Sequence, residues 1–526
     1  MRPHTRCPWG LMLPLAVGLA LRLMMAWSIH APWGDNGATV LELARNLSEG
    51  KGFTTLRIWT FYGPAAQFGQ PEGNRQPLLP ILEAGARRIG GDSFRVAQIV
   101  PLLAGLLVVV LSYRIALAVG GRRAGSLAAW FSALDPPQIY FSAQIEDQIV
   151  FTALFLGLVL WSLRHQEAPL RPWVPGVLLG ALYLTRANGL LIAVAYAAVG
   201  LWRRRTRHVL MTCAAAAIVA APWFVRNAHA FGNPFHTDNS FFLWSDGFWS
   251  VFSLRESPPT MTAYFAAHSV ADIALRWLKG AYLSIEGFLI GNIFRDEPFA
   301  RDSLILPLAA MVFGFRRLGR PMAFPLVAFL LHFVTIAWHA HGTYRYFIPF
   351  YALVFVGAGV GLSEAWDRCV SPLPSVRRAW AWCAALFLFL LPLARPIAAT
   401  LSRSDRVVHG EAMEVVDWIE RSTGPDAALM GFPIVEKYLY LYARPTVMTP
   451  FGTMEDVWRV ACDYRVEYLV VSAEQLRWLP ALGQHWIAAD GVVLERDLPP
   501  FLFPQLTTRE GMFRVYRINR EALCSP

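Results

Sequence analysis

Three carboxylates that could serve in catalysis fall in two short stretches of the sequence. Asp35, followed by Asn36, comes directly after the first apolar run, and Glu146 and Asp147 are adjacent in "YFSAQIEDQIVF". A positioned carboxylate can accept the proton of an attacking hydroxyl, which accelerates a reaction by about 10²- to 10⁴-fold. The same residues also cap helices or pair with arginine. A general base is therefore one hypothesis for each acid, and a structural cap or ion pair is the other.

Arginines near the ends of apolar runs form a second group of candidates. Guanidinium groups bind phosphate through bidentate, charge-assisted hydrogen bonds and stay protonated at membrane depth. A single arginine at the end of a span can also simply extend to the lipid headgroups. Together with the carboxylates, the arginines suit an anionic lipid that carries a group to be transferred. The candidates for phosphate binding are Arg75, Arg186, Arg226 and Arg345, and those for the substrate pocket are His341 and Tyr346.

The elements that position these candidate residues are the membrane-spanning helices that the apolar runs predict. Of the 526 residues, 55% are hydrophobic and only 16% are charged, whereas soluble domains carry about 25% charged residues. Two of the runs, 173–185 and 189–202, are short enough to be either two short spans or a re-entrant hairpin, with Arg186 at a depression of the outer surface. The sequence predicts an α-helical polytopic membrane protein with about 11 spans, at 10–30, 96–119, 124–142, 147–164, 173–185, 189–202, 208–225, 303–317, 322–340, 344–363 and 378–398.

Basic residues are concentrated in short loops on one side of the predicted membrane, as in "GRRAG" (121–125), "RRRTRH" (203–208) and "FRRLGR" (315–320). This bias places those loops in the cytoplasm, and it explains the formal net charge of +10 without a nucleic-acid partner. Arg22 interrupts the first apolar run, so we expect a retained span and not a cleaved signal peptide. The N-terminus is then cytoplasmic, and all candidate site residues face outward from a bacterial plasma membrane.

Two long segments and the tail are expected on the outer side. The first outer loop, 31–94, opens with an amphipathic helix that is expected to lie flat on the membrane. The second, 226–302, is rich in Phe and Trp, which serve as interfacial anchors or as platforms for sugars. Its apolar stretch 281–294 is expected to lie on the surface or against the bundle.

The composition changes at about residue 400. The segments 410–422 and 451–464 have the pattern of amphipathic helices, and "AALMGF", "VEYLVVS" and "MFRVYRI" have that of strands. The sequence therefore predicts a transmembrane domain over 1–399 and a small extracytoplasmic α/β domain over 400–526.

The cysteines and histidines give little indication of a metal site. The six cysteines lack metal-ligand spacing, and His339 and His341 do not share a helical face. Cys462 and Cys524 both lie in the tail and could pair in an oxidising compartment, but sequence alone does not fix the pairing. No cofactor is indicated with certainty, and a divalent cation stays open.

Several motifs in order resemble the GT-C class of membrane glycosyltransferases, in particular the protein mannosyltransferase and lipid A aminoarabinose transferase relatives. They are "GDNGATVLELARNLSEGKGF", "RQPLLPIL", "LTRANGLL", "PWFVRNAHAFGNP" and "YRYFIPFYALVFVGAGVG". The resemblance implies a polyprenyl-phosphate sugar donor, an outward-facing site and inversion at the anomeric carbon. Asp35 matches the catalytic acid of the first loop, Arg75 the residue that contacts donor phosphate, and Glu146 or Asp147 the second acidic motif. The family often has a second acid where this chain has Asn36, which weakens the case for a metal held by adjacent carboxylates.

The expected function is transfer of a sugar from a polyprenyl-phosphate donor to an extracytoplasmic acceptor, which is a cell-envelope glycan, a lipid or a protein. One alternative is an oligosaccharide ligase that uses a lipid pyrophosphate donor, and another is an assembly subunit without catalysis. A transporter or flippase is a further alternative, but such proteins place charges near the bilayer midplane and commonly contain inverted repeats. Here Arg22 and Asp135 are the charged residues that fall near the middle of expected spans, and the two halves of the chain do not match.

Overall fold

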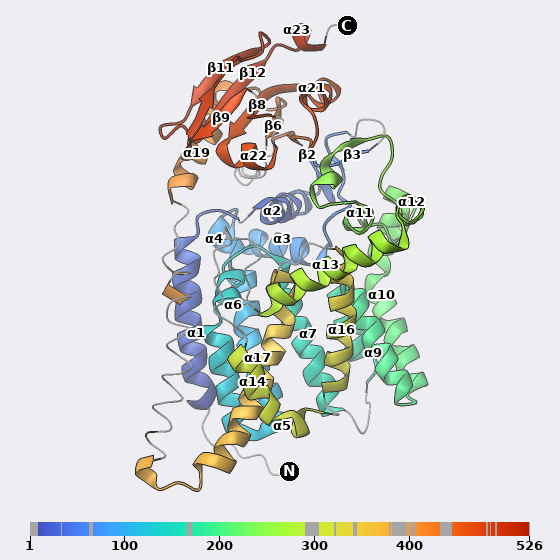
Figure 1. Cartoon of the computed structure of the whole chain (residues 1–526), viewed down its shortest axis with the longest axis vertical. Helices are drawn as coiled ribbons and strands as arrows, with labels where there is room; N and C mark the ends of the chain where they lie inside the picture. The colour runs from blue at the N-terminus through green and yellow to red at the C-terminus, as the bar shows by residue number, and fades with distance from the viewer. Residues whose placement is uncertain are drawn as a thin grey trace.

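The computed structural model describes residues 9–32, 34–62, 67–165, 171–289, 305–319, 322–339, 344–377, 380, 397–398, 401, 406–431, 444–479, 482–483, 485–489 and 492–524. The helices form a bundle, and a smaller α/β domain lies on one end of it (Figure 1). The end with this domain is called the outer end, and the opposite end, where the first described helix begins, is called the inner end.

Among the described residues, five helices are long and apolar enough to cross a membrane. They are α1 (Trp9–Ser28), α5 (Ile99–Leu134), α7 (Asp147–Arg164), α10 (Thr206–Phe231) and α17 (Ile348–Ala365). Shorter helices are α8 (Trp173–Thr185), α9 (Gly189–Trp202), α14 (Ile305–Phe313), α15 (Phe315–Leu318) and α16 (Ala323–His339), and η4 (Trp366–Val370) follows α17. A multi-pass helical protein is thus confirmed. The count of about 11 spans stays a prediction, because most of the run at 378–398 lies outside the described residues.

Helix α5 consists of two limbs joined at Gly121, whose φ of 84° is a conformation that glycine adopts without strain. A Cβ atom on Gly125 would lie 3.1 Å from the carbonyl oxygen of Tyr113, so the second limb packs back on the first. The two limbs match the runs expected at 96–119 and 124–142. The short α6 (Pro136–Phe141) follows and completes the return toward the outer end.

Arg22 is fully buried in α1 and has a structural role. Its guanidinium donates hydrogen bonds to the carbonyl oxygens of Ser132 and Ala133, each at 3.2 Å. These carbonyls would normally accept from the N–H groups four residues on, but those residues are Pro136 and Pro137, which have none. Arg22 therefore stabilises the junction between α5 and α6. It provides no free charge for a transport pathway.

The tail domain contains a six-stranded sheet in the order β11-β12-β8-β6-β7-β2. The strands β2, β7, β6 and β8 are parallel, and β12 and β11 continue antiparallel. Alternate residues of β6, β8 and β12 pack on helices at the two faces, in separate buried cores. The helices are α19 (Arg406–Ser422), α21 (Met454–Asp463), α22 (Ala473–Trp478) and α23 (Arg520–Cys524), and the tail's strands are β6 (Ala428–Gly431), β7 (Thr446–Met448), β8 (Val466–Ser472), β9 (Trp486–Ala489), β10 (Val492–Glu495), β11 (Leu502–Thr507) and β12 (Phe513–Ile518).

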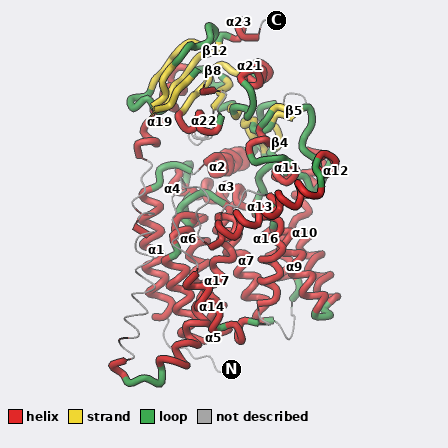
Figure 2. Tube along the Cα trace, in the orientation of Figure 1, coloured by secondary structure: helices red, strands yellow, loops and turns green. Residues whose placement is uncertain are grey.

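The edge strand of this sheet, β2 (Arg57–Ile58), comes from the first outer loop and pairs with β7 of the tail. Ile58 is fully buried, in one core with Met430 and Val447. The first loop and the tail domain are thus parts of one folded unit at the outer end (Figure 2). The loop's other elements are α2 (Gly34–Ser48), β1 (Thr54–Thr55), β3 (Phe61–Tyr62), β4 (Gln70–Pro71), α3 (Leu78–Gly90) and α4 (Phe94–Ala97).

Aromatic residues of the second outer segment join the same unit. Phe242 stacks on Trp59 of the first loop at a ring-centroid distance of 6.1 Å, and Trp249 stacks on Phe451 of the tail at 6.3 Å. These rings therefore link three parts of the chain, which differs from the expected membrane anchors or sugar platforms. The segment forms α11 (Asn239–Trp244), η1 (Trp249–Phe252), β5 (Leu254–Arg255), α12 (Met261–Ala267) and α13 (Val270–Leu289). Helix α13 lies across the bundle against α16, as expected for the described part of 281–294 (Figure 1).

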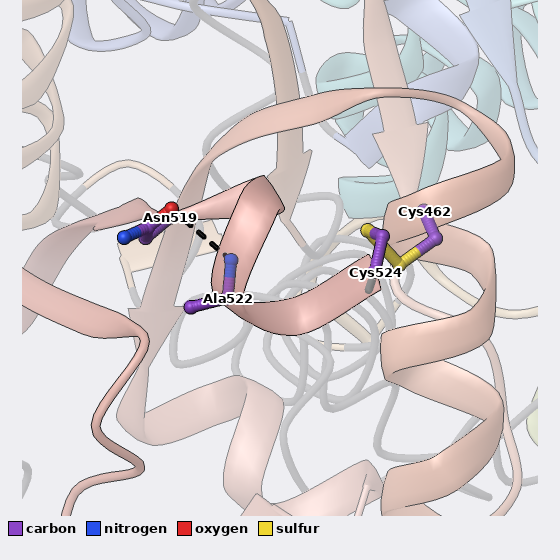
Figure 3. Close-up of a disulfide and its surroundings, with 4 residues drawn as sticks. All are labelled: Cys462, Asn519, Ala522 and Cys524. Carbon is purple, nitrogen blue, oxygen red and sulfur yellow. Dashed lines mark hydrogen bonds between the residues drawn. A yellow bond between two sulfur atoms is a disulfide. The ribbon is translucent and has the colours of Figure 1, made fainter. Parts of the chain in front are cut away.

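Cys462 of α21 and Cys524 of α23 form a disulfide that closes the end of the tail domain on itself (Figure 3). Asn519 caps the start of α23 by accepting a hydrogen bond from the N–H of Ala522. The pairing that the sequence left open is therefore present in the structure.

Candidate functional site

The two acidic motifs meet at the outer end of the bundle. Helix α2 begins at Gly34, so Asp35 lies in its first turn, while the Asp35 side chain lies outside what the structure describes. A Cβ atom on Gly37 would lie 3.1 Å from the carbonyl oxygen of Ile145, the residue before Glu146. The first turn of α2 is therefore in direct contact with the segment that carries Glu146 and Asp147.

The Arg75 side chain also contacts the first turn of α2. Its Nη2 donates a hydrogen bond to Oδ1 of Asn36. Its backbone N–H and that of Asn74 donate to Oε1 of Glu72, at 3.1 and 2.6 Å, so the Glu72 carboxyl shapes the turn that presents the guanidinium. The structure thus brings Arg75 beside Asn36, and its role toward a phosphate stays a prediction.

Helix α2 is covered on its polar face as well as its apolar one. Glu42 accepts hydrogen bonds from the N–H of Leu56 at 2.6 Å and the hydroxyl of Thr55 at 2.9 Å, and it is only 8% exposed. Asn46 donates to the Thr54 carbonyl at 2.7 Å. The expected helix at the membrane surface is present, but its polar face contacts the returning loop and not water. This contact connects the start of β2 directly to α2.

A second group of predicted residues gathers at the start of α7. Glu146 is the N-cap residue of α7 and is 3% exposed, and Asp147 follows in the first turn. The Arg186 guanidinium forms an ion pair with Asp147 and lies 5.3 Å from the ring centroid of Tyr346. The Arg345 guanidinium lies 5.4 Å from the same ring. Two arginines and the Asp147 carboxylate therefore lie close to Tyr346.

The hairpin of α8 and α9 holds Arg186 in this position. Its tip contacts α16, where the Asn188 amide lies 3.4 Å from Nδ1 of His332. The other ring nitrogen of His332 donates to the carbonyl oxygen of Tyr346 at 2.9 Å. Tyr346 belongs to η3 (Tyr344–Phe347), directly before α17. The structure thus places Arg186, Tyr346 and Arg345 together.

Two further predicted residues stand apart from this arrangement. Arg226 donates hydrogen bonds to Asn227 at 2.9 Å and to the Phe53 carbonyl at 3.0 Å, and its guanidinium lies 4.7 Å from the ring centroid of Trp223. These contacts give Arg226 a role in holding the first loop to α10. His341 lies outside the described residues.

Sequence reasoning missed a buried acidic cluster next to Arg75. Glu72 is 2% exposed, and burial together with the neighbouring Asp238 raises its pKa to about 7, against a lowering by Arg75. Asp238 in turn pairs with Nε2 of His236 at 2.8 Å. The only sequence signals were the motifs "PEGNR" and "FHTDN", each with an acid in a turn. Because the Glu72 carboxyl holds the turn that contains Arg75, the protonation state of Glu72 affects the candidate site.

The described residues do not provide a metal site. Within these ranges, no group of three or more His, Cys, Asp or Glu side chains is placed to hold an ion. Asn36 stands where the resembling family often has a second acid, and its amide oxygen already accepts a hydrogen bond from Arg75. An oxygen held by a cation of the protein is poorly suited to a second cation.

Comparison with known proteins shows the fold. No protein-family model matches the sequence, and no curated protein is significantly similar to it. ArnT from Cupriavidus metallidurans, solved bound to undecaprenyl phosphate, is 15% identical with a TM-score of 0.59, and 98% of each chain is covered. The Archaeoglobus fulgidus oligosaccharyltransferase AglB, solved with an inhibitory peptide and a dolichol-phosphate, is 15% identical with a TM-score of 0.59. That match covers 93% of this chain and 75% of AglB.

Proposed function

Because the chain has the fold of the GT-C glycosyltransferases, we propose that it is an integral membrane glycosyltransferase. It moves a sugar from a polyprenyl-phosphate donor to an extracytoplasmic acceptor, with inversion. One observation carries this proposal: the first turn of α2, which holds Asp35, contacts both Arg75 and the segment with the second acidic motif. This contact supports Asp35 as the base and Arg75 as the phosphate-binding cation of one site.

In the proposed reaction, Asp35 accepts the proton of the acceptor hydroxyl as its oxygen attacks the anomeric carbon. The bond between that carbon and the phosphate oxygen breaks, and the phosphate leaves with the electron pair. Phosphate is a tolerable leaving group, so the enzyme needs to neutralise its charge more than to protonate it. Arg75 and Arg345 supply this positive charge, and Arg186 adds to it through its place beside Tyr346. The contacts of Arg226 support a positioning role for that residue.

Two observations support an extracytoplasmic site. The tail shares its sheet with the first outer loop, so both lie on one side of the bundle. The Cys462–Cys524 disulfide suits an oxidising compartment. A reporter that is active only in the cytoplasm, fused after Pro526, should give no signal in a bacterial host. A strong signal would place the tail and the site on the cytoplasmic side.

The function itself is tested by comparing the lipids of a deletion strain with those of its parent. Loss of the enzyme should leave a polyprenyl-phosphate sugar unused and one envelope glycan, lipid or protein without that sugar. The rival oligosaccharide ligase would instead leave a lipid-pyrophosphate oligosaccharide. The monophosphate donor is favoured because ArnT, whose match covers 98% of both chains, was solved bound to undecaprenyl phosphate. An unchanged lipid and glycan profile would contradict both.

A further inference from the structure

A separate cavity of about 50 Å³ lies at the inner end of the bundle, remote from the site described above. It is formed where α7 and α9 end and where α10 begins, next to the start of α16 (Figure 1). Its polar lining consists of Ser162, His165, Tyr196, Arg203, Arg205 and His208, with the ring of Trp161 beside them. None of the described residues that line it is acidic.

The cavity holds positive charge in a fixed arrangement. The Tyr196 hydroxyl lies 3.1 Å from Nε2 of His208. The Arg205 guanidinium is close enough to both to interact electrostatically, and it makes no ion pair with a carboxylate among the described residues. His165 stacks on Trp161 at a ring-centroid distance of 3.7 Å and donates through Nδ1 to the Trp161 carbonyl at 3.0 Å. In the imidazolium form its Nε2–H can donate to an anionic ligand.

We propose that this cavity binds the phosphate group of an anionic ligand, with a phospholipid headgroup from the adjacent leaflet as the favoured source. A volume of about 50 Å³ has room for roughly three to five water-sized groups, which is the size of a phosphate. Guanidinium, imidazole and hydroxyl groups are the donors that phosphate oxygens prefer. Basic pockets between transmembrane helices bind anionic headgroups in this way.

The surroundings of the cavity favour a lipid over a soluble phosphate. Leu201 and Trp202, directly before Arg203, are 50% and 75% exposed at the end of α9. An exposed Trp at the end of a membrane helix is typical of the lipid interface. A headgroup seated in the cavity would thus have apolar surface beside it for its acyl chains.

The test is binding of short-chain lipids to the purified full-length protein in detergent. Dioctanoyl phosphatidylglycerol should raise the thermal midpoint in a saturable manner, and dioctanoyl phosphatidylcholine should not. Arg205→Gln should weaken phosphatidylglycerol binding about ten- to hundredfold, because it removes a charge-assisted hydrogen bond. Arg207→Gln is the matched control, since Arg207 is exposed two residues away and does not line the cavity. Its affinity should equal that of the unmodified protein.

The same measurement with inorganic phosphate shows whether the phosphate group comes from a lipid or from a soluble compound. Saturable stabilisation by phosphate as strong as that by phosphatidylglycerol would assign the cavity to a soluble phosphate compound. Equal affinity losses in Arg205→Gln and Arg207→Gln would overturn the proposal, because general surface charge would then explain the binding. If Arg205→Gln is unstable without ligand, Tyr196→Phe replaces it. Tyr196→Phe should also weaken binding, and unchanged affinity in this variant would overturn the proposal.

Discussion

Arg75 donates a hydrogen bond to Asn36, the residue that directly follows the candidate base Asp35. The backbone turn of Arg75 is in turn held by the buried carboxyl of Glu72. Arg75, which we propose binds phosphate, is thus linked through the Asn36 side chain to Asp35, which we propose accepts the proton. Substituting each residue in turn tests the role proposed for it.

Replacing Asp35 by Asn should slow sugar transfer by about a hundredfold or more, because Asn keeps the size of the side chain but cannot accept a proton. Donor binding and thermal stability should stay the same, since Asn is as suitable as Asp near a helix N-terminus. The measurement is sugar release from a polyprenyl-phosphate donor by the purified variant.

Asp92→Asn is the control for this experiment, because Asp92 is a half-exposed carboxylate at the same end of the protein. It should retain full activity. Near-normal turnover in Asp35→Asn would remove Asp35 from the mechanism and would make Glu146 and Asp147 the leading candidates.

Replacing Arg75 by Ala should raise the donor concentration needed for half-maximal rate and should also lower turnover. A charge-assisted hydrogen bond contributes about 1.5–3 kcal/mol, which corresponds to roughly a ten- to hundredfold loss in kcat/KM. Arg88→Ala, at an exposed position of α3, should have little effect. Equal losses in the two variants would indicate a general effect of outer charge and no phosphate site.

The Asp147–Arg186 ion pair should show energetic coupling in a double-mutant cycle. The side chains are only 23% and 16% exposed, so removing one partner leaves the other charge poorly solvated. We expect Asp147→Asn and Arg186→Gln to be less damaging together than the sum of their separate effects. The expected coupling is on the order of 1 kcal/mol in thermal stability or in kcat/KM. Strict additivity would show that the pair does not act as a unit.

Glu72 should make the stability of the outer unit depend on pH. Its folded-state pKa of about 7 is raised from 4.5, so the fold binds this proton more tightly than the unfolded chain does. The resulting stability is fully present below pH 4.5 and is lost as the pH rises through about 7. Glu72→Gln stays neutral, so its thermal midpoint should fall less than that of the unmodified protein between pH 5 and pH 8. The exposed Glu256→Gln should behave like the unmodified protein, and a Glu72→Gln curve parallel to it would contradict the assignment.

Ile58→Ala should destabilise the outer unit, because it creates a cavity in the core shared by the first loop and the tail. Ile58 is fully buried, and such truncations cost about 2–5 kcal/mol. Ile89→Ala is the control, since Ile89 is 92% exposed. The readout is the thermal midpoint in detergent together with sugar transfer. Equal midpoints would show that β2 contributes little to the unit.

Local patterns predicted much of this protein. The helices α19 and α21 and the strands β8 and β12 lie where amphipathic and alternating patterns indicated them. The predicted residues Arg186, Arg345 and Tyr346 do lie together, because each is at the outer end of a helix whose length the apolar runs define.

Contacts between distant segments could not be predicted in the same way. Strand β2 has two residues and no local signal, and it exists because β7 offers an open edge. Likewise, Glu72 acquires its raised pKa from Asp238 and from burial, neither of which is visible in a single loop sequence. The polar face of α2 has the sequence pattern of a surface exposed to water. A loop that covers this face forms hydrogen bonds with the same kinds of side chains as water does, so the pattern does not distinguish the two.

The pairing of β2 with β7 also imposes an order on biosynthesis. Residues 57–58 are synthesised early, but their partners at 446–448 are about 390 residues further along the chain. At roughly 5–20 residues per second, the first loop waits on the order of 20–80 s for the strand that completes it. During that interval Ile58 lacks the cover that Met430 and Val447 give it in the finished protein. The folded unit at the outer end is therefore completed last, when the tail has been synthesised.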